Sequence, residues 1–329
     1  MNTYGLVARK LHSEAEYLKV VAGQARIPQY IEHFEADGDA YLAMEFVHGP
    51  NLREYVGAMG RRGGGLETEE ALRTFKQAAE VVGVIHGTHR VHRDITPRNF
   101  LMRVGNPILI DFGTIAQDTG PNLEVATGIS AGGYHAPEQA RGVASRLCDV
   151  YSLGSCLYFL LTGEDPPPTT PEGRSELLLL DEMRGRGVPA PLQAIITRCR
   201  ALKPQERYDN VDALLRDVRL FEHPELRACA RCGDLIERRP LVCPVCGLRY
   251  CSACGAVVGD DPRCGTCGRR ACTWCGSAVR GDGAFCLACG GSTQGRACVS
   301  CRRPQPLHAR FCRSCGAPGE PSSNQSLAA

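Results

Sequence analysis

The chain has 329 residues, of which 22% are charged, 43% hydrophobic and 6% aromatic, and its formal net charge is +2. This composition is typical of a globular protein with about two domains, and it excludes disordered and fibrous chains. The richest apolar run, Leu153–Leu161, has nine residues, whereas a membrane-spanning helix needs roughly 18, so we expect a soluble protein.

The first ten residues do not resemble a secretory signal peptide. Their sequence, MNTYGLVARK, has no apolar core followed by a small-residue cleavage site, which is what a secretory signal requires. We therefore expect a cytoplasmic protein whose cysteines stay reduced.

The distribution of cysteine divides the chain into two parts. Of the 19 cysteines, Cys148, Cys156 and Cys199 lie in the first 228 residues, and the other sixteen lie between Cys229 and Cys315. So abrupt a change in composition marks a domain boundary, which we place near residues 221–228.

The first part has a mixed pattern of strands and helices. Alternating apolar residues at Tyr41–Phe46 and Ile108–Ile110 indicate strands, and a 3.6-residue period over Thr68–Gly83 indicates a helix. The second part consists of small units rich in glycine and cysteine, with almost no aliphatic core, and it ends in a polar tail that we expect to be disordered.

Several short motifs follow one another in the first part. In chain order they are His92-Arg93-Asp94 with Asn99, Asp111-Phe112-Gly113, Ala136-Pro137-Glu138, the run DVYSLG from Asp149 to Gly154, and Arg207 in PQERY. Their order and spacing resemble the catalytic core of the protein kinases, over roughly residues 11–222. The resemblance implies an α+β, bilobal fold and transfer of the γ-phosphate of ATP.

The same resemblance implies roles for the polar residues of these motifs. Asp94 would orient the acceptor hydroxyl and take its proton. Asn99 and Asp111 would hold Mg²⁺, which prefers oxygen ligands and neutralises the phosphate oxygens. Arg207 stands where the family has an arginine that pairs with the glutamate of the third motif, here Glu138.

Nucleotide contacts are implied upstream of these motifs. Residues 41–47 (YLAMEFV) resemble the strand and hinge that hold adenine through backbone groups, with Glu45 and Val47 at the nucleotide and Met44 at the gatekeeper position. Residues 13–16 resemble the helix of the small lobe. Ser13 would be its N-cap, and Glu14 would stand at the position that pairs with a phosphate-binding lysine.

This sequence departs from the family at its N-terminus. Protein kinases open with a glycine-rich loop and a lysine on the third strand, but only thirteen residues precede Glu14, and Lys10 is the single lysine among them. Three intervening residues span at most ~14 Å, so we interpret Lys10 as a solvated charge flanking the helix and the small lobe as truncated. Either the chain begins late or it is a pseudokinase; the retained Asp94, Asn99 and Asp111 favour the first explanation, because idle polar groups are costly to desolvate.

A second departure lies beside the expected catalytic aspartate. Ser/Thr-specific members usually have lysine two residues after it, where this chain has Thr96, and the threonine that commonly meets that lysine is replaced by Ala131. The paired replacement removes a positive charge that faces phosphate. The loss of one electrostatic stabiliser typically lowers a rate on the order of 10²–10³-fold.

The segment between the second and third motifs contains four hydroxyl residues, Thr114, Thr119, Thr127 and Ser130. A phosphate on one of them could pair with Arg93. The alternative, that they are ordinary loop hydroxyls, stays open.

The sixteen C-terminal cysteines form eight C-x-x-C pairs. The gaps between successive pairs are ten, four, nine, four, ten, eight and ten residues. Two knuckles joined by a short hairpin need about ten residues between pairs, so the pairs group in consecutive twos into four structural zinc sites. The expected ligands are Cys229, Cys232, Cys243, Cys246; Cys251, Cys254, Cys264, Cys267; Cys272, Cys275, Cys286, Cys289; and Cys298, Cys301, Cys312, Cys315.

Glycine follows seven of the eight pairs, which suits a backbone of positive φ. The repeat resembles tandem double zinc ribbons, whose folding energy comes from the metal. We expect Trp274, Phe285 and Phe311 to pack over the metal sites. Disulfides would need an oxidising compartment, redox pairs would not repeat eightfold, and a site with four cysteines has no open position for catalysis.

Charge bears on what the ribbons bind. Residues 1–228 carry 25 basic and 30 acidic side chains, whereas residues 229–316 carry 13 arginines and 5 acidic side chains, a net charge of +8. Four zinc ions, each bound by four thiolates, contribute −2 per site and cancel that charge. A protein partner is therefore favoured over nucleic acid, although arginine pairs such as Arg269 and Arg270 could still touch phosphate.

These observations predict a protein-kinase-like domain at 1–222, a linker at 223–228, double zinc ribbons at 229–268 and 269–316, and a disordered tail at 317–329. The leading hypothesis is a Ser/Thr protein kinase that uses ATP, Mg²⁺ and four structural Zn²⁺ ions, acts on a protein substrate, and uses its ribbons for partner recruitment or autoregulation. A pseudokinase scaffold that binds proteins through its ribbons is the first alternative. A nucleic-acid-binding zinc-ribbon protein is the second.

Overall fold

The computed structural model describes most of the chain. The described residues are 3–60, 64–118, 120–121, 133–169, 174–238, 241–258, 263–272, 275–279, 286–288, 295–298, 300–301, 304–306, 311–312 and 315–318. Contacts divide the chain into two compact units, Met1–Phe221 and Glu222–Ala329, here called the N-terminal unit and the C-terminal unit. Among the described residues, no helix combines the length and apolarity needed to cross a membrane.

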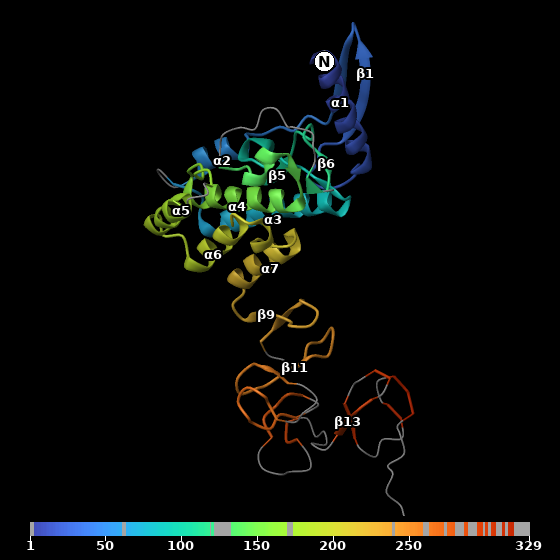
Figure 1. Ribbon diagram of the computed structural model, residues 1–329, viewed down its shortest axis with the longest axis vertical. Coiled ribbons are helices and arrows are strands. Elements are labelled where there is room, and N and C mark those ends of the chain that lie inside the picture. Colours follow the sequence, from blue (N-terminus) through green and yellow to red (C-terminus); the bar gives the residue numbers. More distant parts are fainter. Residues whose placement is uncertain are drawn as a thin grey trace, which may run out of the picture. The chain divides into compact units, whose positions relative to one another are not determined.

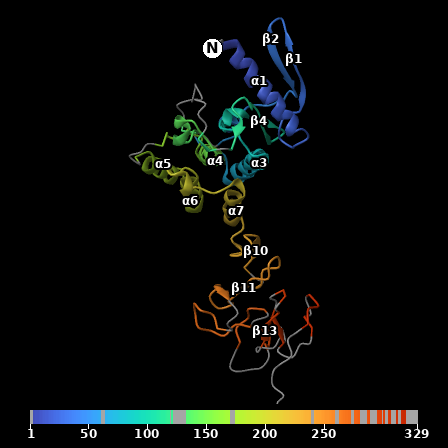
Figure 2. The same ribbon diagram turned by 45° about the vertical axis from the view of Figure 1, so that its right-hand side comes forward.

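The N-terminal unit opens with a helix and a hairpin. Helix α1 (Thr3–Val20) packs along strands β1 (Tyr30–Ala36) and β2 (Asp39–Met44), as Figures 1 and 2 show. The two strands are antiparallel, and Asp37 and Gly38 between them have φ of 53° and 84°. Two positive φ angles define the tight turn that Asp-Gly favours, which fixes the register of the hairpin.

One expectation for this region is wrong. Helix α1 begins at Thr3, so Ser13 lies in its interior and cannot be its N-cap. Residues 3–12 contain helix-compatible side chains and a single glycine, Gly5, and nothing in that stretch stops a helix before Ser13.

A second group of elements forms the middle of the unit. Helix α2 (Leu52–Met59) begins at Asn51, whose side chain and that of Glu54 cap each other's backbone N–H groups. Helix α3 (Thr68–Gly87) confirms the helix expected over residues 68–83. The short strands that follow are β3 (Arg90–Val91), β4 (Phe100–Arg103), β5 (Asn106–Leu109), β6 (Ala116–Gln117), β7 (Gly120–Pro121) and β8 (Val143–Ala144), and they pair as β3 with β6, β4 with β5, and β7 with β8.

Helix α4 (Arg146–Thr162) is the centre of the core. Every residue from Cys148 to Thr162 is buried, and α3 and α6 (Ala190–Cys199) pack against it. A Cβ atom at Gly154 would lie 2.3 Å from the Cβ of Cys199, so only glycine allows this close approach. Helices α5 (Arg174–Gly185) and α7 (Val211–Glu222) complete the unit. The apolar run at 153–161 is thus a buried core helix.

The C-terminal unit has little regular structure among its described residues. It contains the antiparallel pairs β9 (Leu226–Ala228) with β10 (Leu235–Glu237), β11 (Arg249–Tyr250) with β12 (Val257–Val258), and β13 (Gly295–Ala297) with β14 (Pro304–Pro306). Its hydrophobic clusters are small and are built largely around buried cysteines. Such units bury too little apolar surface to be stable without another source of folding energy.

Candidate functional site

A buried aspartate holds the loop that carries the first motif. Asp149, in the first turn of α4, is fully buried and accepts hydrogen bonds from the backbone N–H groups of His92 (2.9 Å) and Arg93 (2.8 Å) and from Nε2 of His86 (2.9 Å). Arg93 is held at φ 74°, a conformation that costs energy outside glycine and persists where surrounding contacts enforce it. The loop is therefore fixed to the core helix just before Asp94.

The carboxylate of Asp94 receives two side-chain donors. Nδ2 of Asn99 donates to the carboxylate Oδ2 (3.0 Å) and to the carbonyl oxygen of Asp94 (2.8 Å), and Nε2 of His135 lies 3.2 Å from Oδ1. The hydrogen bond from His135, with that from Asn99, holds the pKa of Asp94 below its usual range despite its burial. Asp94 is thus an ionised carboxylate held in a fixed orientation.

Asn99 and Asp111 come together through a backbone hydrogen bond. The N–H of Ile110 donates to the carbonyl oxygen of Asn99 over 2.8 Å, so the next residue, Asp111, follows directly beside Asn99. Asp111 is exposed, has φ 64°, and its Oδ1 accepts from the N–H of Gly113. The side-chain nitrogen of Asn99 donates its hydrogen bonds to Asp94, so the side-chain oxygen of Asn99 can accept or coordinate a ligand. Oxygen donors from an exposed aspartate and a partly buried asparagine fit Mg²⁺.

Helix α1 contacts the second motif directly. Phe112 is fully buried, its ring lies 5.3 Å from that of His92 and 5.7 Å from that of Tyr17, and its N–H donates to Oε1 of Glu14 over 2.9 Å. Glu14 is 8% exposed, and burial raises its pKa. Among the described residues no cation pairs with Glu14, and Lys10 is exposed one helical turn away on the same helix.

The expected adenine-binding segment follows β2 without a break. The N–H of Glu45 donates to the carbonyl oxygen of Gln29 (2.8 Å), and its carboxylate bonds Arg103 and the N–H of Gln29. The side chain of Val47 is 5% exposed, whereas that of Phe46 is 76% exposed. Both the N–H and the carboxylate of Glu45 are thus engaged with neighbouring residues.

Two buried arginines anchor the third motif and the segment that precedes it. Arg207 binds both carboxylate oxygens of Glu138 (2.6 and 2.9 Å), which is the pair expected from the sequence. Arg200, 6% exposed, donates to the carbonyl oxygens of Gly133 (2.5 Å) and Pro167 (2.6 Å) and to Oγ of Ser155. Sequence reasoning missed Arg200 because a lone arginine after an apolar helix gives no pattern that separates it from a surface charge.

Of the four hydroxyl residues considered as phosphorylation sites, the structure describes one. The hydroxyl of Thr114 donates to the carbonyl oxygen of His92 over 2.7 Å and is partly buried, so it is engaged in the fold rather than presented to solvent. Thr119, Thr127 and Ser130 lie outside the described residues, as does Ala131.

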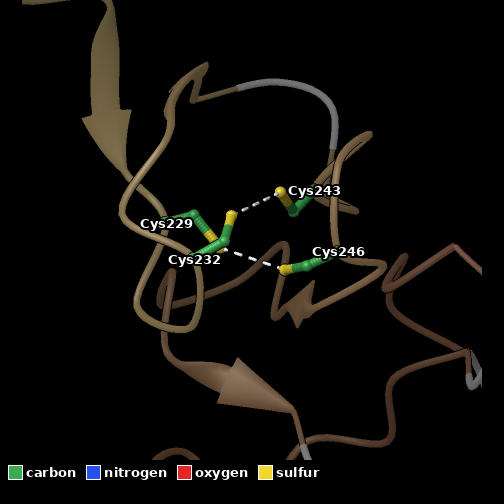
Figure 3. Close-up of side chains that lie close together, drawn as sticks. All are labelled: Cys229, Cys232, Cys243 and Cys246. Atoms are coloured by element: carbon green, nitrogen blue, oxygen red, sulfur yellow. Dashed lines mark hydrogen bonds between the residues drawn. The ribbon is translucent and has the colours of Figure 1, made fainter.

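The cysteines cluster as their spacing predicts. In three clusters of four and one of three, all Sγ atoms lie within 4.8 Å of one another. Figure 3 shows the first, in which Sγ of Cys229 lies 3.5 Å from that of Cys246 and Sγ of Cys232 lies 3.7 Å from that of Cys243. The cluster of three contains Cys272, Cys275 and Cys286, and Cys289 lies outside the described residues. The members of the other two are Cys251, Cys254, Cys264 and Cys267, and Cys298, Cys301, Cys312 and Cys315.

Six of the knuckles in the described residues share one backbone geometry. The glycine after the second cysteine has positive φ, and its N–H donates to the carbonyl oxygen of the first cysteine, as in Gly233 with Cys229 (φ 77°, 2.9 Å) and Gly247 with Cys243 (φ 73°, 2.9 Å). Glycine adopts this conformation without strain, which explains why it recurs. Sets of four converging thiols suit tetrahedral zinc.

The expectation for the aromatic residues is not met where the structure describes them. Phe311 is 64% exposed, so most of its surface is not packed over its metal site. Trp274 and Phe285 lie outside the described residues.

Comparisons with known proteins agree with this geometry. A family model for the protein kinase domain matches residues 4–216, and one for the double zinc ribbon matches residues 272–316. The chain is 32% identical over 220 residues to serine/threonine-protein kinase C of Synechocystis, a match that covers 64% of this chain and 40% of that protein. It is 33% identical over 199 residues to serine/threonine-protein kinase PrkC of Bacillus subtilis, which covers 56% of this chain and 29% of that protein. The chain thus spans less than half the length of these relatives.

Proposed function

This chain belongs to the protein kinase family, and we propose that its N-terminal unit transfers the γ-phosphate of ATP to a Ser or Thr hydroxyl of a protein. The observation that carries the proposal is the linked set Asp94, Asn99 and Asp111, joined by the Asn99 amide on one side and the Ile110 N–H on the other. The similarity to serine/threonine kinases supports the acceptor class.

Each member of this set has a distinct role in the proposal. Asp94, ionised and oriented, accepts a hydrogen bond from the acceptor hydroxyl and takes its proton as the oxygen bonds to phosphorus. The bond from the γ-phosphorus to the bridging oxygen breaks, and ADP leaves. Asn99 and Asp111 would hold Mg²⁺, which supplies neutralisation of the phosphate charge.

The nucleotide would lie between the hinge and this set. We propose that adenine contacts the backbone of Glu45 and Val47, where the side chains are turned to other partners. The small lobe, as far as the described residues form it, consists of α1, β1 and β2. In it, Glu14 has a positioning role, because its carboxylate holds the N–H of Phe112 next to Asp111.

The zinc ribbons have a separate proposed role. We propose that residues 223–228 link the kinase unit to double zinc ribbons at 229–268 and 269–316, and that these recruit a protein partner. Val245 and Leu287 stand between the cysteines of two knuckles with 64% and 98% of their surface exposed. We propose that these two side chains belong to the surface that contacts the partner.

Phosphate transfer tests the kinase proposal. The zinc-loaded chain is incubated with Mg²⁺ and ATP labelled in the γ-phosphate, together with a Ser- and Thr-rich acceptor protein, and the acceptor is hydrolysed to its amino acids. We expect label on serine or threonine, and its loss in Asp111→Asn. Unlabelled acceptor with the wild-type chain would instead favour a scaffold that binds proteins through its ribbons.

A further inference from the structure

A histidine from the third-motif segment touches the proposed catalytic carboxylate. Nε2 of His135 lies 3.2 Å from Oδ1 of Asp94, and the His135 side chain is 12% exposed. Among the described residues, the only other side-chain donor to this carboxylate is Asn99, on Oδ2. Each carboxylate oxygen of Asp94 therefore has one side-chain donor, and His135 supplies one of the two hydrogen bonds that orient the carboxylate.

The segment around His135 is clamped on both sides. Oγ of Ser152 donates to the carbonyl oxygen of Tyr134 over 2.7 Å, and the N–H of Ala136 donates to Oε1 of Gln139 over 2.8 Å. Nε2 of Gln139 in turn donates to the carbonyl oxygen of Arg93 over 2.8 Å. The segment thus contacts the Asp94 loop at two points, through His135 and through Gln139. These hydrogen bonds fix the backbone on both sides of His135 and so hold its imidazole beside the carboxylate.

The tautomer of His135 follows from its surroundings. Its Nδ1 is buried and has no hydrogen-bond partner among the described residues, so a proton on Nδ1 would remain unsatisfied, which is unfavourable in a buried position. The ring therefore carries its proton on Nε2 and donates it to Asp94. The lowered pKa of Asp94, for which this hydrogen bond is the largest cause, agrees with that assignment.

We propose that His135 is a positioning residue of phosphate transfer: its Nε2–H fixes one oxygen of Asp94, so that a lone pair of the carboxylate faces the acceptor hydroxyl. This inference rests on the proposed kinase function. His135 itself neither gains nor loses a proton in the step. The proton of the substrate hydroxyl passes to Asp94, and His135 keeps the Asp94 carboxylate in place during the transfer.

Two substitutions separate positioning from packing. His135→Gln keeps an N–H donor, whereas His135→Leu removes it, and His223→Leu makes the same change at a histidine that is 55% exposed and outside the site. Phosphate transfer at saturating acceptor protein is measured for each full-length, zinc-loaded chain, with kcat and the KM for ATP determined separately and thermal unfolding followed in parallel.

We expect His135→Leu to lower kcat about 10- to 100-fold, as for the loss of a hydrogen bond to a charged group, with the KM for ATP and the unfolding temperature unchanged. His135→Gln should keep most of the wild-type kcat, and His223→Leu all of it. An active wild type with an equally active His135→Leu, or with His135→Gln as impaired as His135→Leu, would overturn the inference alone. A wild type that transfers no phosphate would overturn the proposed function, and the inference with it.

The tautomer of His135 gives a second readout that does not depend on activity. In ¹⁵N-histidine spectra of the full chain, the His135 ring should carry its proton on Nε2 in a form protected from exchange with water. That protection should be lost in Asp94→Ala. A ring protonated on Nδ1 in the wild type would contradict the contact on which the inference depends.

Discussion

Asp94→Asn should lower the kcat of phosphate transfer by about 10²–10⁴-fold, the range that general-base catalysis contributes. The amide keeps the size of the side chain but cannot take the proton of the acceptor hydroxyl. The KM for ATP should change little, because Asn99 and Asp111, the proposed Mg²⁺ ligands, remain. Steady-state kinetics with labelled ATP and a protein acceptor measure both constants.

A matched substitution controls for the loss of a negative charge. Asp181→Asn makes the same change on helix α5, at a side chain that is 76% exposed, and it should leave kcat unchanged. Both variants should unfold at the wild-type temperature. If Asp94→Asn kept wild-type kcat, Asp94 would not be the base, and the roles assigned around it would have to be given to other groups.

Removal of zinc should unfold the ribbons and leave the kinase unit folded. Structural zinc supplies about 10–16 kcal/mol of folding free energy in small zinc domains, and the described part of the C-terminal unit has only small clusters around its cysteines. After chelation, amide hydrogens in residues 229–316 should exchange rapidly with solvent, whereas those of α3 and α4 should stay protected. Hydrogen exchange read by mass spectrometry measures both units in one sample.

Cysteine variants test the number of zinc ions and their dependence on the clustered cysteines. Native mass spectrometry should show four zinc ions in the wild type and three in Cys243→Ala, because Cys243 belongs to the first cluster. Cys199→Ala serves as the control, since this buried cysteine lies in the kinase unit and belongs to no cluster of the described residues. An unchanged zinc count in Cys243→Ala would show that Cys243 is not needed to hold a zinc ion.

Residues in recognisable motifs with a fixed spacing could be placed from the sequence. The pairing of Glu138 with Arg207, 69 residues apart, followed from the resemblance to the protein kinases. The grouping of cysteines followed from spacing alone, since a hairpin between two knuckles has a limited length. The glycines after the knuckles followed from backbone sterics.

Features that depend on tertiary packing were not predictable. Ser13 satisfied a local capping pattern, but α1 continues past it because the upstream residues also favour a helix. His135 and Arg200 carry no pattern of their own; their importance arises only when the segment at 133–139 is folded against the Asp94 loop and α4. The roles of His135 and Arg200 depend on contacts between segments far apart in sequence, and neither composition nor periodicity predicts such contacts.

The affinity for ATP, measured by calorimetry with and without Mg²⁺ for the wild type and for Asp111→Asn, is the most direct test that Asn99 and Asp111 form a working nucleotide site. We predict that the wild type binds ATP, that Mg²⁺ tightens the binding, and that Asp111→Asn abolishes the effect of Mg²⁺. A wild type that binds no ATP at any Mg²⁺ concentration would contradict this, and it would leave a kinase fold that serves to present zinc ribbons to a partner.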